Sequence, residues 1–273
     1  MHPGIEHANL SAMIRIKTAR QLAGIRESCR LLGSVLETLE NSVTTGITTA
    51  GLDAIARQEI KALGGKPSFL GYQGFPGALC TSVNEEVIHG IPGDRVLQRG
   101  DVISIDCGVV YDGYYSDSAV TVPVGTVSPE VEKLLQITQE ALERGIHAAC
   151  RGNRVNDVSR AIYQVISEHG YGVVRPYCGH GVGLAIHEDP QIPNYVGRGP
   201  NPRLKSGMVI AVEPMVNLGG DDIEVLDDEW TVVTADNTVS AHFEHTLAIL
   251  GDHTEVLTRR RSESLHSSAE VSA

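Results

Sequence analysis

The stretch Gly100-Asp-Val-Ile-Ser-Ile-Asp106 has a counterpart 107 residues further along the chain, Gly207-Met-Val-Ile-Ala-Val-Glu213. Glycine, valine and isoleucine stand at matching places, and an acidic residue closes each apolar run. Short apolar runs that begin after a glycine are typical of buried strands. The repeated pattern therefore predicts two similar halves, each with a buried strand that ends in a carboxylate.

Helix signals precede the strands in both halves. The first half opens with a T-x-x-Q capping box at Thr18 and Gln21, and the second opens with Ser128-Pro129, an N-cap residue followed by proline. Apolar residues at steps of three and four predict two helices after each start. We expect helices over about 19–39, 50–63, 129–146 and 155–169, and strands over 78–83, 101–110, 118–124, 171–175, 207–216, 229–234 and 245–250.

Pairs of helices followed by runs of strands, without β-α-β alternation, predict the α+β class. Two fused halves would bring Asp106 and Glu213 face to face across a pseudo-twofold axis. Residues 1–12 carry no periodic pattern, and the polar, serine-rich stretch 258–273 cannot bury a core face. We expect one domain over 13–257 between a flexible N-terminal extension and a disordered tail. Translation could start at Met1 or at Met13.

The composition excludes several classes of protein. The 22 basic and 34 acidic residues give a net charge of −12, which argues against binding to the phosphates of nucleic acid. No apolar run approaches the roughly 18 residues of a membrane helix, and the N-terminus lacks the plan of a signal peptide. Five cysteines, none in a C-x-x-C pair, predict a reduced chain without a disulfide framework. We expect a cytoplasmic protein that binds neither nucleic acid nor membranes.

Four acidic residues lie in or beside apolar strands: Asp106, Asp117, Glu213 and Glu244. A buried lone carboxylate costs several kcal/mol unless it is paired or bound to a metal. Any one of them, taken alone, is more often a strand-end acid that faces water. Four together, two of them related by the internal repeat, favour a metal site.

Histidines offer the nitrogen ligand. His180 and His187 lie seven residues apart in a glycine-rich stretch, and His89 stands between apolar and turn residues. A single histidine is usually a hydrogen-bonded core or surface residue, but one imidazole with four carboxylates suits Mn²⁺, Fe²⁺ or Co²⁺. Two divalent ions about 3.5–4 Å apart would balance four carboxylates and could share a hydroxide nucleophile. The sequence contains no G-x-S-x-G, P-loop or H-E-x-x-H motif.

Six motifs together resemble the type I methionine aminopeptidases, which have the pita-bread fold, a duplicated α+β fold around a central antiparallel sheet. The resemblance covers about Met13 to Leu257. The motifs are Ser82-Val-Asn-Glu-Glu-Val-Ile-His-Gly-Ile-Pro92, Asp106 with Asp117, Tyr177-Cys-Gly-His-Gly181, Ile186-His-Glu-Asp-Pro190, Val212-Glu-Pro-Met215 and Phe243-Glu-His-Thr246.

The resemblance implies two divalent metal ions. Asp106 would chelate one ion, and His180 and Glu213 would bind the other, while Asp117 and Glu244 would bridge both. Candidate ions are Co²⁺, Mn²⁺ and Fe²⁺, with Zn²⁺ and Ni²⁺ as further alternatives.

The resemblance also implies how a substrate is handled. His187 would polarise the scissile amide, and His89 would hydrogen-bond the substrate backbone and assist proton transfer to the leaving amine. Glu213 matches the general acid/base carboxylate of the family. A methionine pocket would be lined by Tyr72, Phe75, Cys80 and Trp230.

Four other positions bear on binding. Ile186 stands where many bacterial members have phenylalanine, and Phe69 stands where a small residue is common. Their effect on the methionine pocket stays open. Asn84 and Ser240 match positions that hold a monovalent cation in some relatives.

The implied activity is removal of the initiator methionine from nascent proteins when the second residue is small and uncharged, by a hydroxide that bridges the two metals. We expect a monomer that acts on nascent peptides with a free N-terminal methionine. The physiological metal, the catalytic efficiency and docking at the ribosome exit region stay open.

Other members of the fold are the alternatives. The short spacing from Glu213 to Glu244 has no room for the helical insertion of type II enzymes. Prolidases and Xaa-Pro aminopeptidases usually carry a large N-terminal domain that this sequence does not show. A catalytically inactive binding module would have lost metal ligands, whereas all five stand in place here.

Overall fold

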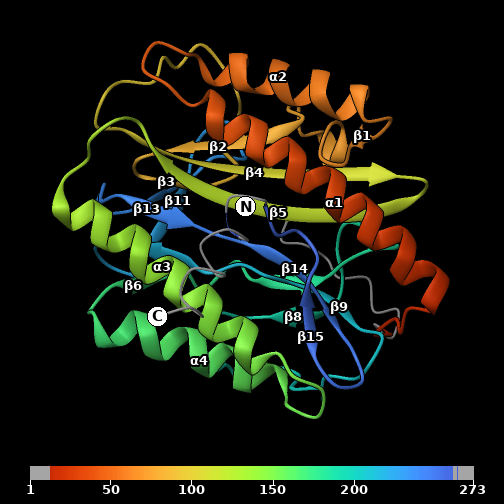
Figure 1. Cartoon of the computed structure of the whole chain (residues 1–273). Coiled ribbons are helices and arrows are strands. Elements are labelled where there is room, and N and C mark those ends of the chain that lie inside the picture. Colours follow the sequence, from red (N-terminus) through yellow and green to blue (C-terminus); the bar gives the residue numbers. More distant parts are fainter. Residues whose placement is uncertain (1–12, 261–262, 264–273) are drawn as a thin grey trace, which may run out of the picture.

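The computed structural model describes residues 13–260 and residue 263. In this part of the chain, two pairs of helices each precede a group of strands (Figure 1). The helices are α1 (Ala19–Ser42), α2 (Thr49–Ala62), α3 (Pro129–Ala148) and α4 (Val155–Glu168), with a short 3-10 turn at Tyr72–Gly74. The strands are β1 (Lys66–Pro67), β2 (Leu79–Val83), β3 (Glu86–Ile88), β4 (Val102–Tyr111), β5 (Tyr114–Pro123), β6 (Gly172–Val173), β7 (Gly179–Gly181), β8 (Glu188–Ile192), β9 (Val209–Val212), β10 (Met215–Asn217), β11 (Ile223–Val225), β12 (Val232–Thr234), β13 (Ser240–His242), β14 (His245–Ile249) and β15 (Thr254–Val256).

The helix starts follow the expected capping chemistry. The Thr18 hydroxyl accepts a hydrogen bond from the Gln21 amide at 3.3 Å, and the Gln21 side chain accepts one from the Thr18 amide at 2.8 Å. In the second half, the Ser128 hydroxyl accepts from the Val131 amide, and Pro129 is the first helical residue. These bonds satisfy amides that have no partner within the helix, so they fix where each helix begins.

Equivalent sheets carry the acidic residues in the two halves. In the first half β4 pairs with β1, β2 and β5, and its Asp106 lies opposite Cys80 of β2. In the second half the order is β15-β14-β9-β7-β8, with β9 in the place of β4. Asp117 lies within β5 rather than before it, because this strand begins at Tyr114 instead of the expected Ser118.

The sequence predicts one continuous strand over 207–216, and this prediction is wrong. β9 ends at Val212, and β10 starts at Met215 and joins β6 and β13 in a different sheet. Pro214 explains the break, because proline has no amide hydrogen to donate to a ladder. Glu213 therefore stands at a corner between two sheets, where its side chain is free to turn toward the opposite half.

Side-chain hydroxyls join the two halves along β5. We call this junction the seam and define it by Ser118, Thr121, Glu244 and Thr246. The Ser118 hydroxyl donates to the Glu244 carbonyl at 2.7 Å, and the Thr246 hydroxyl donates to the Asp117 carbonyl at 2.7 Å. The Glu244 amide donates to the Ala119 carbonyl at 3.0 Å. The seam thus fixes the backbones of Asp117 and Glu244 side by side.

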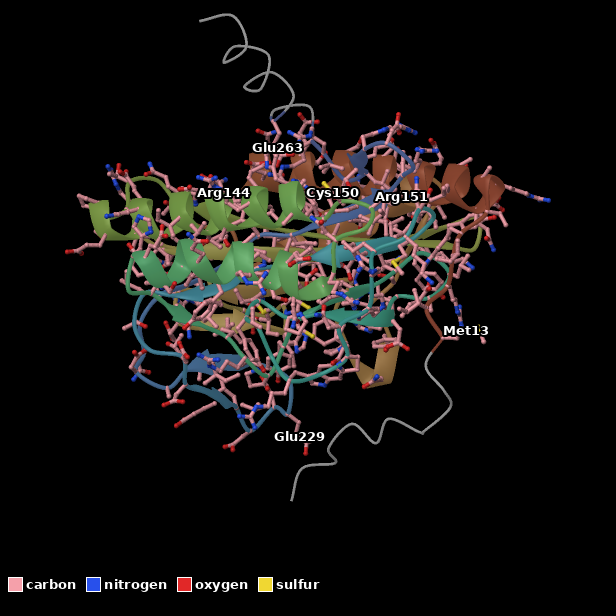
Figure 2. All side chains as sticks on the ribbon, turned by 90° about the horizontal axis from the view of Figure 1, so that it is seen from below. Met13, Arg144, Cys150, Arg151, Glu229 and Glu263 are labelled. Atoms are coloured by element: carbon pink, nitrogen blue, oxygen red, sulfur yellow. The ribbon has the colours of Figure 1, made fainter. Side chains whose placement is uncertain are left out.

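The helices cover one side of the strands. α1 packs on β4 and β5, while α3 packs on α4 and on strands of the second half. Seen at right angles, the helices lie above the strands and Glu229, between β11 and β12, lies on the opposite side (Figure 2). One hydrophobic cluster extends through both halves. Among the described residues, no helix combines the length and the apolar character needed to span a membrane.

The start of the expected tail is part of the folded domain. Thr258 is fully buried, and its hydroxyl accepts from the Thr246 amide at 3.1 Å and lies 3.0 Å from His245 Nδ1. Arg260 is also buried and pairs with Glu40 of α1 at 3.3 Å. The boundary at Leu257 is therefore too early, because a polar side chain can be buried once it finds partners. Residues 1–12 and most of the expected tail lie outside the described residues.

The hydrogen bonds of the seam predict that the isosteric substitution Thr121→Val strongly destabilises the protein. The buried Thr121 hydroxyl both donates to the His242 carbonyl and accepts from the His242 amide, each at 2.8 Å. Thr121→Val leaves both groups buried without partners, so we expect the free energy of unfolding to fall by at least about 2 kcal/mol. Denaturant titration measures it. Thr138→Val is the matched control, because that buried hydroxyl bonds only a carbonyl of its own helix. Equal losses in both variants would contradict the role of the seam.

Candidate metal centre

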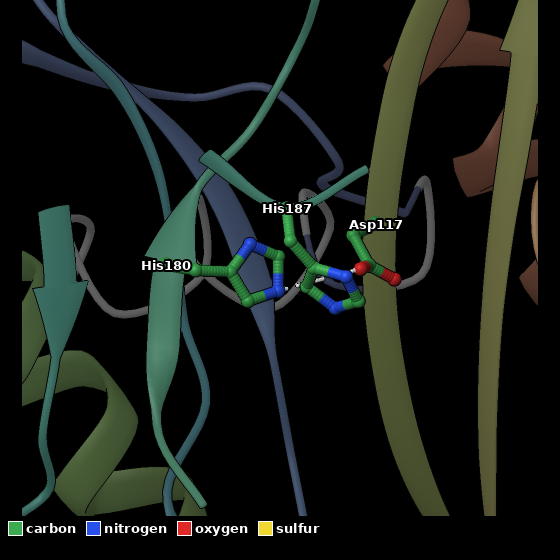
Figure 3. A group of neighbouring side chains, drawn as sticks. All are labelled: Asp117, His180 and His187. Atoms are coloured by element: carbon green, nitrogen blue, oxygen red, sulfur yellow. Dashed lines mark ion pairs between the residues drawn. The ribbon is translucent and has the colours of Figure 1, made fainter. Parts of the chain in front are cut away.

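The four acidic residues and two of the histidines converge where the halves meet. Three overlapping trios have ligand atoms within 4.8 Å of one another. Figure 3 shows the rings of His180 and His187 and the carboxylate of Asp117 pointing into the same space from opposite strands. The trios are Asp106-Asp117-Glu244, His180-Glu213-Glu244 and Asp117-His180-His187.

Burial dominates the electrostatics of the acids. It raises the pKa of Asp106 to about 7 and that of Glu213 to about 8, and the charge of Asp106 adds to the shift at Glu213. The pKa values of Asp117 and Glu244 are raised well above normal by burial and then by the neighbouring carboxylates. Like charges gathered in a medium of low polarity cannot all ionise without a compensating cation.

The histidines of the centre are shifted the opposite way. Burial lowers the pKa of His180 to about 3, with the ring of His187 adding to the effect. Its Nε2 lies 3.5 Å from Glu213 Oε1 and 3.7 Å from Asp117 Oδ2. Burial also lowers the pKa of His187. A neutral imidazole keeps a lone pair for a metal, so His180 is suited to be a ligand at neutral pH.

The residues present fit a pair of divalent cations. Asp106 Oδ1, Asp117 Oδ1 and Glu244 Oε1 are buried and have no hydrogen-bond partner within the protein. Orphaned buried carboxylate oxygens are rare, and a bound cation would satisfy all three. Glu244 belongs to two of the trios, so one carboxylate can serve both ions. Oxygen ligands with a single imidazole favour Mn²⁺, Fe²⁺ or Co²⁺ over ions that prefer thiolate ligands.

A small apolar cluster adjoins the acids. Phe75, Cys80, Phe69 and Ile186 form one buried cluster, with Tyr72 and Trp230 packed against it. The rings of Phe75 and Trp230 meet edge to face at 5.1 Å between centroids. The four residues expected to form the pocket are thus brought together. Phe69 and Ile186, whose effect the sequence left open, belong to the same cluster.

His89 and His187 stand between the pocket and the acids. His187 Nδ1 lies 2.9 Å from the Tyr72 hydroxyl, and its ring lies 4.4 Å from that of His180. His89 has positive φ and packs edge to face on Tyr177 at 5.4 Å. Burial lowers the pKa of His89 to about 4, so its ring is neutral. Because His187 also belongs to one trio, its expected role as a substrate contact stays a prediction.

Asn84 and Ser240 lie next to each other, since the Ser240 amide donates to the Asn84 carbonyl at 2.9 Å. Their side chains are engaged elsewhere: the Asn84 amide group bonds Asp101 and the Ser240 hydroxyl bonds Asn217, each at 2.9 Å. The cation site stays a prediction.

His242 is the site residue that sequence reasoning missed. It is almost fully buried, neither ring nitrogen has a hydrogen-bond partner, and Nε2 lies 3.7 Å from Glu213 Oε2. Burial and the ring of His89 lower the pKa of His242 to about 3. Its position two residues before Glu244, just ahead of the Phe243-Glu-His-Thr246 motif, is a signal that could have drawn attention to it.

Comparisons with known proteins agree with the motifs. Metallopeptidase family M24 matches residues 23–250. The methionine aminopeptidase of Treponema pallidum is 52% identical over 247 residues, which are 90% of this chain and 96% of that protein. Methionine aminopeptidase 1 of Bacillus subtilis is 50% identical over 247 residues, 90% of this chain and 100% of that protein.

A solved structure gives the same result. The crystal structure of methionine aminopeptidase from Thermotoga maritima has a TM-score of 0.88 and 40% identity, and the match covers 91% of this chain and 100% of that chain. The resemblance to this family and the pita-bread fold are both confirmed.

The electrostatics predict how the metal-free protein responds to pH. Asp106 and Glu213 bind their protons more tightly folded than unfolded, so their stabilisation is lost as pH rises through the folded pKa values of about 7 and about 8. The buried histidines are neutral in the folded state, and in the unfolded state they lose their remaining protons between about pH 6.5 and 7.5, which offsets only part of this loss. Between pH 6.5 and 8 we therefore expect the free energy of unfolding to fall, by up to about 1.4 kcal/mol per pH unit for each protonated carboxyl.

Chemical denaturation of chelator-treated protein at several pH values measures this slope. Saturating Mn²⁺ should remove it, and Asp106→Asn should flatten it without metal. Asp112→Asn, at an exposed hairpin, is the matched control and should keep the wild-type slope. A profile that is flat in metal-free wild type would contradict the assigned electrostatics.

Proposed function

The chain belongs to metallopeptidase family M24, and we propose that it is an aminopeptidase that removes methionine from the N-terminus of polypeptides. One observation carries the proposal. Cys80 in the apolar pocket lies opposite Asp106 of the acidic cluster in the paired strands β2 and β4. A side chain in the pocket would therefore have its own α-amine within reach of the carboxylates.

The pocket chemistry suits methionine. Its lining is apolar and aromatic, with the Cys80 thiol and the rings of Phe75 and Trp230. A thioether makes favourable contacts with aromatic rings and adapts to irregular apolar space. The acidic cluster next to the pocket attracts a free, positively charged α-amine and would reject a blocked one.

Two divalent metal ions held by Asp106, Asp117, His180, Glu213 and Glu244 would supply Lewis acidity and a water of lowered pKa. The protein supplies the proton transfers. Glu213 accepts the proton of the attacking water and delivers it to the amine nitrogen as the C–N bond breaks.

His187 would hydrogen-bond the carbonyl of the scissile amide. His187 Nδ1 lies 2.9 Å from the Tyr72 hydroxyl, which also accepts a hydrogen bond from the Gln73 amide group at 3.2 Å. We propose that the Tyr72 hydroxyl donates to Nδ1, which leaves the ring proton on Nε2, where it can be donated to substrate. His89, a neutral ring, would bond the substrate backbone and assist protonation of the leaving amine.

The side chain after methionine would meet a narrow space. The rings of His187 and His180 lie 4.4 Å apart, and those of His89 and Tyr177 lie 5.4 Å apart. We therefore propose that only small, uncharged second residues are accepted. Such substrates are newly made chains with a free initiator methionine, and we propose that the protein acts on them in the cytoplasm.

His89→Ala and His187→Ala should separate catalysis from metal binding. If both rings act on substrate, each variant keeps its metal content and loses roughly 10²–10⁴ in turnover, as expected for removal of a proton-transfer or electrostatic group. Elemental analysis with Met-Ala-Ser hydrolysis measures both quantities. His147→Ala, an exposed helix position, is the control. Loss of metal from His187→Ala would show that this ring is a ligand.

Substrate choice gives the test of the activity itself. Met-Gly and Met-Ala peptides should be cleaved, whereas Met-Leu, Met-Lys and N-formyl-Met-Ala peptides should be nearly inert because of the narrow space and the acidic cluster. Ala-Pro is the control for the prolidase alternative. Mass spectrometry of peptides incubated with Mn²⁺-loaded protein measures the products. Comparable rates across the Met series would overturn the specificity, and preference for Ala-Pro would overturn the function.

A further inference from the structure

A buried ion pair involves Glu188, the residue that follows His187 in the chain. Lys17 Nζ and Glu188 Oε2 are 2.9 Å apart, and the two side chains are 1% and 3% exposed. The partners are 171 residues apart in sequence. Burying both charges is costly, and such a pair is weak support for stability by itself. Its position next to His187 raises the question of what it holds in place.

The second oxygen of Glu188 closes the turn that precedes His187. Glu188 Oε1 accepts hydrogen bonds from the Leu184 amide at 2.6 Å and the Ala185 amide at 3.1 Å. The same turn is tightened by a bond from the Gly183 amide to the Ala185 carbonyl at 3.1 Å. Figure 3 shows His187 pointing from this connection toward Asp117. The acceptor at position 188 therefore determines where the His187 backbone lies.

Lys17 is itself fixed to the second half of the fold. Its amide donates to the Gly207 carbonyl at 2.7 Å, just before β9, the strand that leads to Glu213. Gly207 has a φ of +89°, and a Cβ there would lie 2.7 Å from Ile16 and 3.0 Å from the Lys17 carbonyl. Only glycine allows this close approach. Lys17 thus ties the turn before His187 to the base of the strand that leads to Glu213.

We propose that Lys17 and Glu188 are positioning residues for catalysis: Glu188 holds the His187 turn through its two amide bonds, and Lys17 keeps that carboxylate in place. The inference rests on the proposed function, because it assigns a purpose to the placement of His187. Neither residue touches substrate. Their effect is carried by the backbone of the turn, and a shift of about 1 Å in a catalytic ring is enough to slow turnover 10²-fold.

Two double variants separate positioning from stability. Lys17→Met/Glu188→Gln removes both charges but keeps an oxygen that can accept from Leu184 and Ala185. Lys17→Met/Glu188→Leu removes both charges and the acceptor. Neither leaves the uncompensated buried charge that would endanger folding in the single variant Lys17→Met. Arg26→Met is the matched control, since the Arg26–Glu255 pair joins α1 to the region of β15 at 2.7 Å and lies away from the turn.

The measurements are kcat and KM for Met-Ala-Ser with Mn²⁺-loaded full chain, metal content, and Tm. We expect the glutamine double variant to keep kcat within about threefold of wild type. We expect the leucine double variant to lose roughly 10²-fold in kcat, with KM and metal content nearly unchanged. Arg26→Met should alter Tm alone. Equal kcat in both double variants, or kcat that simply follows Tm across the series, would overturn the inference.

A measurement that does not depend on turnover tests this inference separately from the proposed function. In metal-free, ¹⁵N-histidine-labelled protein, the His187 ring signal is identified by its loss in His187→Ala. It should move in the leucine double variant and stay near its wild-type position in the glutamine variant. An unchanged signal in both contradicts the positioning role. Failure of wild type to cleave any Met peptide instead contradicts the proposed function, whatever the spectra show.

Discussion

Mutual repulsion among four buried carboxylates is the constraint on which this structure depends. Asp106, Asp117, Glu213 and Glu244 lie at the meeting point of two half-domains. Burial raises the pKa of each, and neighbouring carboxylates raise the pKa values of Asp117, Glu213 and Glu244 further. Left alone, such a cluster would push the halves apart above neutral pH or bind protons. The protein must therefore supply both a rigid frame and a route to neutralise the charge, and a bound pair of cations would do the second.

The frame is rigid because the acids sit on backbone that is fixed in several ways. Asp106 lies in the middle of β4 between two paired strands, so its backbone cannot shift alone. Asp117 and Glu244 are held through the seam, where hydroxyl groups bond the opposite backbone in place of a regular ladder. Hydroxyls leave room for the acid side chains to project into the centre, which a continuous sheet across the junction would restrict.

The helix starts, the strands β4 and β9 and the set of acidic residues could be predicted from the sequence, because local chemistry determines them. The capping box at Thr18 and the Ser128-Pro129 start define helix beginnings without reference to the rest of the chain. The repeated apolar runs give β4 and β9 and thereby the relation between Asp106 and Glu213. The expected ligand set comes together because each acid is tied to a strand whose pairing follows from that repeat.

What the sequence did not show depends on partners far away in the chain. β7 is three residues with two glycines, so no local pattern marks it, and it exists because β8 and β9 pair with it. Thr258 looks like tail until His245 and Thr246 are placed beside it. Residues such as Lys17 and Glu188, which we propose to position a functional group without contacting ligand, carry no sequence motif of their own.

Burial shifts the pKa values of the acids and of the histidines at the centre in opposite directions. Loss of water raises the pKa of acids and lowers that of histidines, so acids retain protons while the rings of His89, His180 and His187 become neutral. A neutral ring has one donor and one acceptor nitrogen, and its use depends on which nitrogen holds the proton. At His187 the contact that bears on this choice is the Tyr72 hydroxyl, which lies 2.9 Å from Nδ1. The burial that would make the acids need a cation therefore also keeps His89 and His187 neutral, as our proposal requires of the rings that would bond the substrate amide.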